Sequence, residues 1–311
     1  MITLIIVTSL ILSIISIIFF QNIFIKNNIF DKINARSSHN SIATRSGGIA
    51  LFFVIFSISL FCYLTGIVLF DYSIIIPLGI LFIVGLYDDF YDVDAMLKFI
   101  FQIIVAKIII DNGLVIDNLH GIFGIFQINR LLAQILTILI IVSIINAINF
   151  IDGIDGLAIS VTILFIIAFE FFAKDGSNYN YLSIISLASL APLYIFNFRK
   201  KNKVFLGDSG SYLLGGIVSI YVLTILSQDY IIKQDFDIHK ILFVISILFY
   251  PIIDLVRIFI IRLSNGKSPF RADKKHIHHY LNRYFNSHPK TIAFILISSF
   301  LIILTFQILF N

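Results

Sequence analysis

The sequence predicts an all-α protein, a polytopic membrane bundle of about ten transmembrane helices with both termini outside. The prediction rests on composition, on recurring apolar runs and on the placement of Lys and Arg. Of the 311 residues, 59% are apolar and 13% are charged, against roughly 25% charged residues in soluble proteins. Mean hydropathy is +1.00. An ordinary soluble protein is therefore excluded, and one integral membrane domain over residues 1–311 is expected.

Ten apolar runs approach the length that crosses the hydrocarbon core, roughly 17–25 residues. The first run is interpreted as an anchor helix, since no basic segment precedes it and no small-residue cleavage site follows it. The shorter runs need polar flanking residues to complete a crossing. The expected spans are Ile2–Ile25, Gly47–Phe70, Ser73–Leu86, Leu97–Ile110, Leu131–Ile148, Leu157–Phe172, Tyr181–Phe196, Tyr212–Leu226, Ile241–Leu263 and Thr291–Phe310.

The basic residues support this number of spans and their orientation. With the N-terminus outside, 16 Lys and Arg residues fall in the predicted inside segments and 4 fall in the outside segments. Because Lys and Arg are enriched on the cytoplasmic side, the distribution favours N-out and C-out. Cys62 is the only cysteine, which excludes an intrachain disulfide and a Cys-based metal site.

Seven of the 18 acidic residues fall in three successive inside connections. Carboxylates at the membrane edge are costly and mark function, and gathered like charges repel unless a cation joins them. Hard divalent cations take oxygen ligands, and Mg²⁺ typically uses one or two carboxylates plus substrate phosphate. The pattern predicts Mg²⁺, with Mn²⁺ as an alternative, and a phosphate substrate. The seven are Asp88, Asp89, Asp92, Asp94, Asp152, Asp155 and Asp208.

The first two acidic groups each have a simpler alternative. The Asp88-Asp89 pair is equally typical of a polar loop that keeps a helix end in water. Asn149, Asp152 and Asp155 are spaced i, i+3, i+6, so on a helix they would fall within an arc of about 120° and could face one site. Two Asx-capped turns would also accommodate them, but would not explain why this segment lacks Lys and Arg.

The third acidic group is Asp208, which lies between Gly207 and Ser209 where a helix is expected to begin. A basic run at 199–203 precedes it. A helix N-terminus with a nearby Lys suits phosphate. An N-cap preceded by positive-inside residues is the alternative.

The last motif combines Arg271 with His276, His278 and His279. Zinc is not expected there, because no Cys is nearby and the Asp-rich inside face suits a harder metal. Clustered His, Arg and Lys side chains fit a diphosphate better. A basic patch on anionic lipid is the alternative.

These four motifs, in this order and on one face, resemble the bacterial polyprenyl-phosphate N-acetylhexosamine-1-phosphate transferases, the glycosyltransferase 4 family. The match runs from about Asp31 to His279 and includes the first inside loop, where Ile42 and Thr44 replace the family's prolines. Lys98 and Gln102 resemble the family's K…Q pair. The H-I-H-H motif followed by Tyr280 is similar to the N-acetylglucosamine-type and O-antigen-type enzymes and argues against a peptidoglycan role.

The resemblance implies a Mg-dependent transfer of N-acetylhexosamine-1-phosphate from a UDP-sugar to undecaprenyl phosphate, with release of UMP. Two anions must meet, so charge neutralisation and positioning would dominate catalysis. The enzyme would lie in the bacterial inner membrane with its site on the cytoplasmic face, and its product would enter O-antigen or related glycan synthesis. The implied surroundings are membrane lipid. Nucleic acid is not expected as a partner, and a homodimer is left open.

Residue roles follow from the same match. The metal ligands are expected to be Asp208 with Asp89 or Asp152, and Asp88 is expected to orient or deprotonate the lipid phosphate. The implied substrate contacts are Phe205 and Asp155 for the nucleoside, Asn149 for phosphate or metal, Lys98 for the lipid phosphate, and Arg271, His276, His278 and His279 for the diphosphate or sugar.

Other classes fit less well. A CDP-alcohol phosphatidyltransferase would need an Arg after its Asp-Gly-x-Ala, and Ile159 stands there instead. An aromatic prenyltransferase has four-residue spacing between its Asp residues. A divalent-cation transporter would want acids at mid-bilayer, where only Glu170 and Asp254 are candidates. A peptidoglycan-type transferase is the alternative within the family, and nothing in the sequence identifies the sugar.

Overall fold

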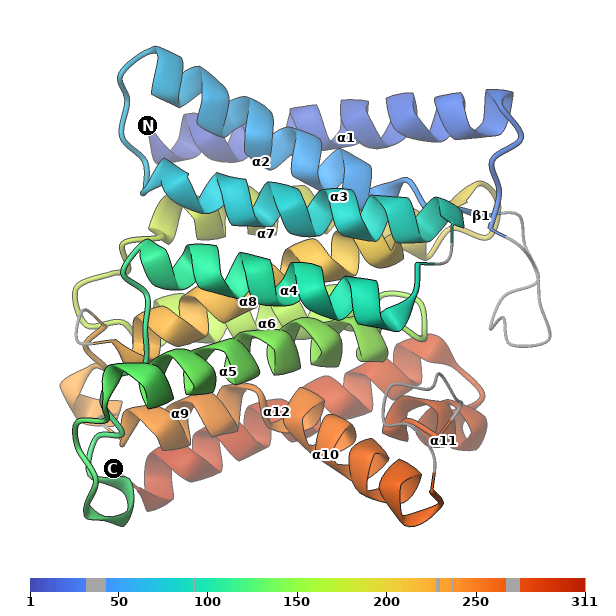
Figure 1. Ribbon diagram of the computed structural model, residues 1–311. Helices are drawn as coiled ribbons and strands as arrows, with labels where there is room; N and C mark the ends of the chain where they lie inside the picture. The colour runs from blue at the N-terminus through green and yellow to red at the C-terminus, as the bar shows by residue number, and fades with distance from the viewer. Residues whose placement is uncertain (32–42, 92, 228–229, 237, 267–274, 311) are drawn as a thin grey trace.

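The computed structural model describes residues 1–31, 43–91, 93–227, 230–236, 238–266 and 275–310, and these are almost entirely helical (Figure 1). In chain order the elements are α1 (Ile2–Lys26), β1 (Ala43–Thr44), α2 (Gly47–Leu64), η1 (Tyr72–Ile74), α3 (Ile75–Tyr91), α4 (Ala95–Asp111), η2 (Ile122–Gly124), α5 (Arg130–Ile151), α6 (Leu157–Phe172), α7 (Asn180–Asn197), β2 (Lys203–Val204), α8 (Gly207–Leu226), η3 (Gln234–Phe236), α9 (Lys240–Ile247), α10 (Phe249–Ser264), α11 (Ile277–Phe285) and α12 (His288–Leu309).

Each predicted span contains a helix, but three boundaries differ from the prediction by five residues or more and one run is divided. The second helix ends at Leu64, well before Phe70, and α3 runs on to Tyr91. The eighth helix begins at Gly207 instead of Tyr212. The ninth run is two helices, α9 and α10, bent by 78°. The short helix α11 was not predicted, because its amphipathic residues lie in a segment that composition marks as polar.

The helices make this a multi-pass membrane protein. Among the residues described, six helices are long and apolar enough to cross a membrane, and the bent α9–α10 pair would be a seventh. The predicted count of about ten is not reached by this measure, because α4 and α6, at 17 and 16 residues, are too short and α7 is not among the six. Both chain ends lie at the same end of the bundle, as Figure 1 shows.

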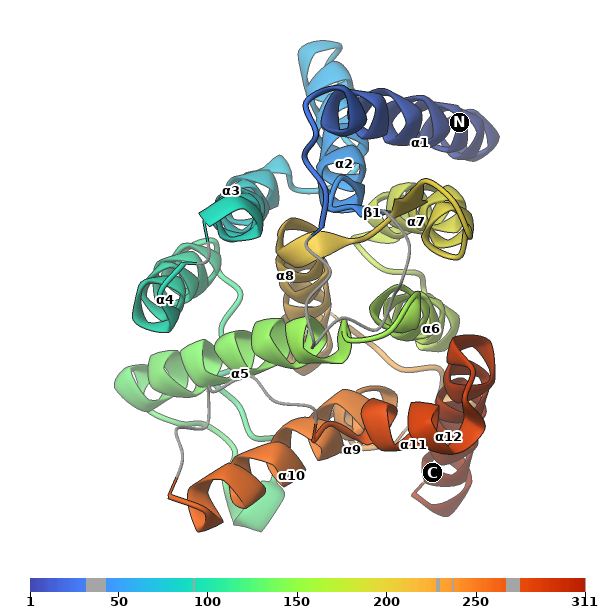
Figure 2. The same cartoon turned by 90° about the vertical axis from the view of Figure 1, so that its right-hand side faces the viewer.

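Helix α8 forms the centre of the bundle. Figure 2 places it among α2, α3, α5, α6 and α7, and its apolar stretch is entirely buried. Glycines permit the closest approaches, as small residues do between membrane helices. A Cβ on Gly48 of α2 would lie 2.6 Å from the Cα of Gly210, and one on Gly85 of α3 would lie 2.6 Å from the Cα of Ser209. The first turn of α8 is therefore clamped between two other helices.

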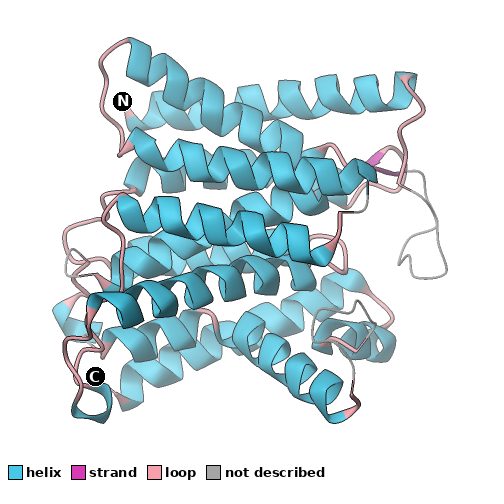
Figure 3. Cartoon of the chain, in the orientation of Figure 1, coloured by secondary structure: helices cyan, strands magenta, loops and turns pink. Residues whose placement is uncertain are grey.

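A two-residue parallel sheet ties the start of α2 to the start of α8. In its register Ala43 pairs with Lys203 and Thr44 with Val204. Beyond it, the backbone N–H of Gly47 donates to the carbonyl of Phe205 at 2.9 Å. Figure 3 shows these strands at the end of the bundle opposite the two termini. This backbone pairing fixes the loop that precedes Asp208.

Candidate active site

The predicted carboxylates belong to the last turn of α3, the end of α5 and the first turn of α8. In Figure 1 these helix ends lie on the side of β1, away from the chain termini. Asp88 and Asp89 occupy the last turn of α3, and not a loop as predicted. Asp152 follows α5, and Asp208 lies in the first turn of α8. Asp94 instead caps α4 by accepting from the N–H of Met96. Asp92 lies outside the described residues.

Asp89 caps helix α8 from another helix. Its Oδ1 accepts from the backbone N–H of Asp208 at 2.9 Å, and its Oδ2 accepts from that of Ser209 at 3.0 Å. These are two of the N–H groups that a helix cannot satisfy internally, and a carboxylate there also favours the helix dipole. A Cβ on Gly207, whose φ is +72°, would lie 2.7 Å from Asp89 Oδ2. Gly207 thus permits the approach of Asp89 to α8.

Asp208 and Asp88 are bound by different partners. Asp208 Oδ1 accepts from the amide of Asn149 at 2.7 Å, and that amide also donates to Ser211 Oγ at 2.8 Å. The Asp88 side chain is 3% exposed and pairs with Lys98 Nζ; its Oδ1 accepts from the N–H of Val93 at 2.8 Å. Asp88, Asn149 and Asp208 therefore come from three helices, α3, α5 and α8, and α4 contributes Lys98.

Asp152 experiences the negative charge of the other carboxylates. It keeps some contact with solvent, but desolvation by the surrounding protein and the charges of Asp208, Asp89 and Asp155 raise its pKa to about 8. The guanidinium of Arg45 opposes this only in part. Arg45 itself pairs with Asp31 at 2.7 Å and approaches Asp89 at 3.6 Å. An excess of negative charge therefore remains at this point.

The expectation that Asn149, Asp152 and Asp155 share one helical face is wrong. Helix α5 ends at Ile151, and the turn that follows directs Asp155 to Lys203 Nζ at 2.6 Å and to His288 Nδ1 at 2.8 Å. Burial works to raise the pKa of Asp155, but the hydrogen bonds from His288 and Lys203 outweigh it and lower the pKa. Lys203 also lies 5.6 Å from the ring centroid of Phe205, so both predicted nucleoside residues adjoin one cation.

The histidine motif is brought to the same end of the bundle by α11. His276 and His278 are buried, at 4% and 0% exposure, and the rings of His278 and His279 lie 4.2 Å apart. Burial and the neighbouring histidines hold the pKa of His278 well below its ordinary value of 6.5. A Cβ on Gly153 would overlap His278 Nε2, so this ring packs on the turn that carries Asp152. Arg271 lies outside the described residues.

The donor set suits a hard cation. Carboxylate oxygens of Asp88, Asp152 and Asp208 lie with Asn149 at one end of the bundle, and Mg²⁺ prefers oxygen ligands. Across the parts of the chain that the structure describes, no three His, Cys, Asp or Glu side chains form a preassembled metal site. Mg²⁺ usually needs only one or two carboxylates and completes its shell with water and substrate phosphate, so the residues fit this metal.

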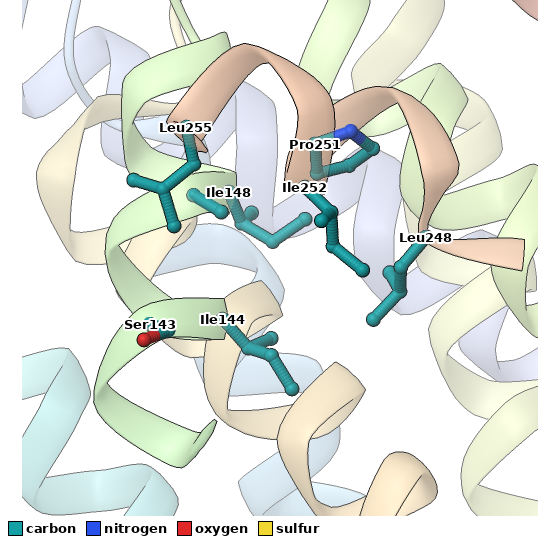
Figure 4. Close-up of a pocket in the computed structure, with 8 residues that line it drawn as sticks. Ser143, Ile144, Ile148, Leu248, Pro251, Ile252 and Leu255 are labelled. Carbon is teal, nitrogen blue, oxygen red and sulfur yellow. The ribbon is translucent and has the colours of Figure 1, made fainter. Parts of the chain in front are cut away.

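Two hollows lie along α5, and the larger of them borders the site. The larger, 480 Å³, lies between α4, α5 and α8 and is lined by Asp94, Ala95, Met96, Lys98, Phe99, Gln102, Asn146, Asn149, Phe150 and Tyr212. The smaller, 40 Å³, is an apolar hollow between α5 and the α9–α10 bend (Figure 4). The larger is roomy and polar enough for a phosphate group, whereas the smaller offers only aliphatic contact apart from Ser143.

Several residues of the site were not chosen from the sequence as site residues. They are Arg45, Lys203 and His288, together with Asn146 and Tyr212 in the larger cavity. Lys203 was part of the basic run, and its neighbour Phe205 could have signalled it. His288 gave no signal, because it is a single His beside a Pro at the start of an apolar run.

Comparison with known proteins adds to this geometry. Residues 71–226 match glycosyl transferase family 4, and this stretch holds the carboxylates of α3, the α5–α6 turn and α8. The undecaprenyl-phosphate alpha-N-acetylglucosaminyl 1-phosphate transferase of Pasteurella multocida is 34% identical, with 86% of this chain and 75% of that protein aligned. The chain belongs to glycosyl transferase family 4. This confirms the resemblance drawn from the motifs, and the protein is an enzyme of the transferase class.

Further relatives of this transferase carry similar names. A probable undecaprenyl-phosphate N-acetylglucosaminyl 1-phosphate transferase of Bacillus subtilis is 32% identical over 90% of this chain and 77% of its own length. A decaprenyl-phosphate N-acetylglucosaminephosphotransferase of Mycobacterium tuberculosis is 28% identical over 84% and 70%. Polyprenyl phosphate and N-acetylglucosamine thus appear in the names of relatives from different bacteria.

Proposed function

We propose that this transferase moves N-acetylhexosamine-1-phosphate from a UDP-sugar to undecaprenyl phosphate and releases UMP. One observation carries the proposal: Asp88, Asp152 and Asp208, from three separate segments, converge beside Lys98 and a polar cavity at one end of a membrane bundle. A site at a membrane edge suits one aqueous and one lipid substrate. The names of the relatives favour N-acetylglucosamine as the sugar and undecaprenyl phosphate as the acceptor.

The chemistry needs two anions to react. An oxygen of the lipid phosphate attacks the phosphorus that carries the sugar, and the bond from that phosphorus to the oxygen of UMP breaks. Lys98 would hold the lipid phosphate, because its ammonium lines the polar cavity and is already paired with Asp88. Asp88 would orient the attacking phosphate or take its proton. Positioning and charge neutralisation are expected to supply most of the catalysis.

We propose Mg²⁺ as the metal, with Asp208 as the first ligand and Asp152 as the second. When bound, Mg²⁺ would neutralise the diphosphate and act as a Lewis acid. Asp89 is less suited than predicted, since both of its oxygens already accept from the backbone of α8. Asn149 would hold Asp208 in place through the amide hydrogen bond at 2.7 Å.

The nucleoside is proposed to bind beside Phe205 and Asp155. Lys203 Nζ and His288 Nδ1 both contact Oδ2 of Asp155, which leaves Oδ1 for a uracil N–H. The Phe205 ring would stack on the base. Arg271, His278 and His279 are proposed to hold the diphosphate or the sugar.

We further propose ten crossings, with N-out and C-out, in the bacterial inner membrane and with the site on the cytoplasmic face. The distribution of Lys and Arg supports this orientation, and chain ends on one side of the bundle accord with an even number of crossings. O-antigen or a related envelope glycan is the proposed destination of the product. Homodimer formation stays a prediction.

The test is a UMP-release assay on purified protein. UMP should appear only when a UDP-N-acetylhexosamine, undecaprenyl phosphate and Mg²⁺ are all present, and a panel of UDP-sugars should identify the donor. Release of UMP without the lipid would indicate a hydrolase and overturn the proposal. Inactivity with every UDP-sugar, from protein that still unfolds cooperatively, would do the same.

A further inference from the structure

The histidine motif is held by one face of α10. Tyr250, Asp254 and Arg262 are spaced i, i+4, i+12, so they fall within an arc of about 120° on the helix, and all three are buried. Tyr250 Oη lies 3.3 Å from His278 Nδ1. Asp254 and Arg262 both reach His276. The family resemblance assigned none of these α10 residues a role.

His276 is engaged at both ring nitrogens. Its Nδ1 lies 2.7 Å from Asp254 Oδ2, and its Nε2 lies 3.4 Å from a guanidinium nitrogen of Arg262. An ionised carboxylate only accepts hydrogen bonds, and a guanidinium only donates them. The pair of contacts therefore selects the neutral imidazole with its proton on Nδ1. Neither nitrogen is left to bind a substrate phosphate or sugar.

Asp254 also fixes the backbone of the motif. Its Oδ1 accepts from the N–H of Ile277 at 2.7 Å, and Ile277 is the first residue of α11. One carboxylate that is 1% exposed thus determines both the direction of the His276 ring and the start of the helix that carries His278 and His279. The Phe150 ring, 5.6 Å from the His276 ring, packs beside it.

His278 differs from His276 in the hydrogen bonding of its ring. Its Nε2 is buried and has no hydrogen-bond partner among the described residues. That nitrogen faces Gly153, next to Asp152. Because His276 fixes the start of α11, it also positions the His278 ring, which borders the carboxylates.

We infer that Asp254, supported by Arg262, is a positioning residue of this transferase: it fixes the tautomer and place of His276, which anchors α11 and does not itself contact substrate. The inference rests on the proposed function and corrects one part of it, because the resemblance assigned His276 to the diphosphate or sugar. Among the described residues of the motif, the substrate contacts then belong to His278 and His279.

The first test is Asp254→Asn. The new amide can keep its oxygen on the Ile277 N–H, but its NH₂ then faces His276 Nδ1 and forces the proton to Nε2, against the Arg262 guanidinium. We expect the KM for the UDP-sugar to rise on the order of 10-fold, as for other residues that orient a functional histidine. The KM for undecaprenyl phosphate should stay within about 2-fold of the original, since Lys98 and its cavity are untouched.

Glu170→Gln is the matched control. Glu170 accepts from Ser177, Asn180 and Ser183 at 2.7, 3.0 and 2.5 Å, on helices α6 and α7 away from the histidine motif. This variant should lower the thermal midpoint without changing the KM for the UDP-sugar. An equal KM change in both variants would show that Asp254 acts only through stability and would overturn the inference.

A second measurement does not depend on activity. In protein labelled with ¹⁵N-histidine, the His276 signals, assigned by their loss in His276→Asn, should report a proton on Nδ1. A proton on Nε2 would overturn the inference even if Asp254→Asn were impaired. His276→Asn should also keep more UDP-sugar affinity than His276→Ala, because the Asn amide can still donate to Asp254.

The outcomes separate the two proposals. Wild-type protein that releases no UMP would refute the proposed function, while the tautomer of His276 would still be measured. Active wild-type protein with an unchanged KM in Asp254→Asn would refute the positioning role alone.

Discussion

Each carboxylate of the site has different hydrogen-bond or ion-pair partners. Asp89 accepts from two backbone N–H groups of α8, Asp88 pairs with Lys98, and Asp155 pairs with Lys203 and His288. Asp208 accepts from an uncharged amide, that of Asn149, and its side chain also contacts that of Asp88. Asp208 and Asp152 are both crowded by other carboxylates. Because crowded carboxylates are the ones that most need a metal, catalysis is expected to depend most on these two residues.

Asp208→Asn tests this ranking. The Asn side chain keeps an oxygen for the Asn149 amide but loses its charge, so turnover should fall by about 100-fold or more, with little change in the thermal midpoint. UMP release and a thermal unfolding curve measure the two quantities. Asp111→Asn is the control, because Asp111 is an exposed acid paired with Lys107 elsewhere on the bundle. Near-normal turnover of Asp208→Asn would remove Asp208 from the metal site.

The raised pKa of Asp152 predicts how the stability of the folded protein changes with pH. Its pKa is raised to about 8, against an ordinary value near 4 in the unfolded chain. The folded state therefore binds more protons between these values, and stability should fall as pH rises from about 4 to 8. Chemical unfolding without divalent cations should show this slope, and Asp152→Asn should reduce it. Added Mg²⁺ should stabilise the protein more at pH 8.5 than at pH 6; an equal effect at both would contradict the prediction.

At the scale of elements, glycines determine how closely α2 and α3 approach α8. Gly48 faces the backbone of Gly210, and Gly85 faces the backbone of Asp208 and Ser209. A backbone neighbour cannot rotate away as a side chain can. Gly85 therefore fixes the distance between the carboxylates of α3 and the first turn of α8, which is the distance that the site requires, and Gly48 fixes the approach of α2 to the same turn.

Gly85→Ala and Gly79→Ala form a matched pair on α3. At Gly85 a Cβ would lie 2.6 Å from the Cα of Ser209, whereas at Gly79 it would meet the Phe52 ring at 3.5 Å, an ordinary contact. Gly85→Ala should destabilise by about 1–3 kcal/mol or more through overpacking, and should impair turnover by moving Asp89. Gly79→Ala should be neutral or stabilise by up to about 1 kcal/mol. Equal unfolding midpoints for the two variants would refute the close-approach argument.

For the whole molecule, the separation of the two ends is the main functional property. The carboxylates, the two strands and the histidine helix lie at one end of the bundle, and both termini lie at the other (Figure 1). Under the proposed orientation the first end faces the cytoplasm, where a UDP-sugar is available. The apolar sides of the outer helices, such as α1 and α12, carry exposed Leu, Ile and Phe residues, as expected where lipid surrounds them.

Single cysteines test the orientation. In a Cys62→Ser background, Asp175→Cys and Lys201→Cys place one thiol in the α6–α7 connection and one beside β2; both positions are exposed. A membrane-impermeant maleimide should label position 175 in intact cells and position 201 only after the membrane is opened. The reverse pattern would show that the site faces outside, and labelling of both in intact cells would contradict an opposed placement of the two connections.

The sequence determined the membrane class and the place of the long helices, and it gave the residues that are proposed to carry the chemistry. Those features depend on local composition and on residue type, and both can be read along the chain. The ranges of α3 and α8 were less accurate, since polar residues such as Asp88 and Asp208 extend helices whose apolar runs end or begin elsewhere. The bend between α9 and α10 gave no signal in hydropathy, because both helices are apolar.

Only the tertiary structure decided which partner each polar residue has. Asp89 caps α8, and Asp155 pairs with His288. Asp254, which the sequence offered only as a candidate acid of a cation transporter, contacts His276. These pairings join residues as far as 133 positions apart in the chain. The physical reason is that a buried carboxylate must take whatever donors the packing of helices brings to it, and that packing is set by contacts between distant segments and not by the residues beside it.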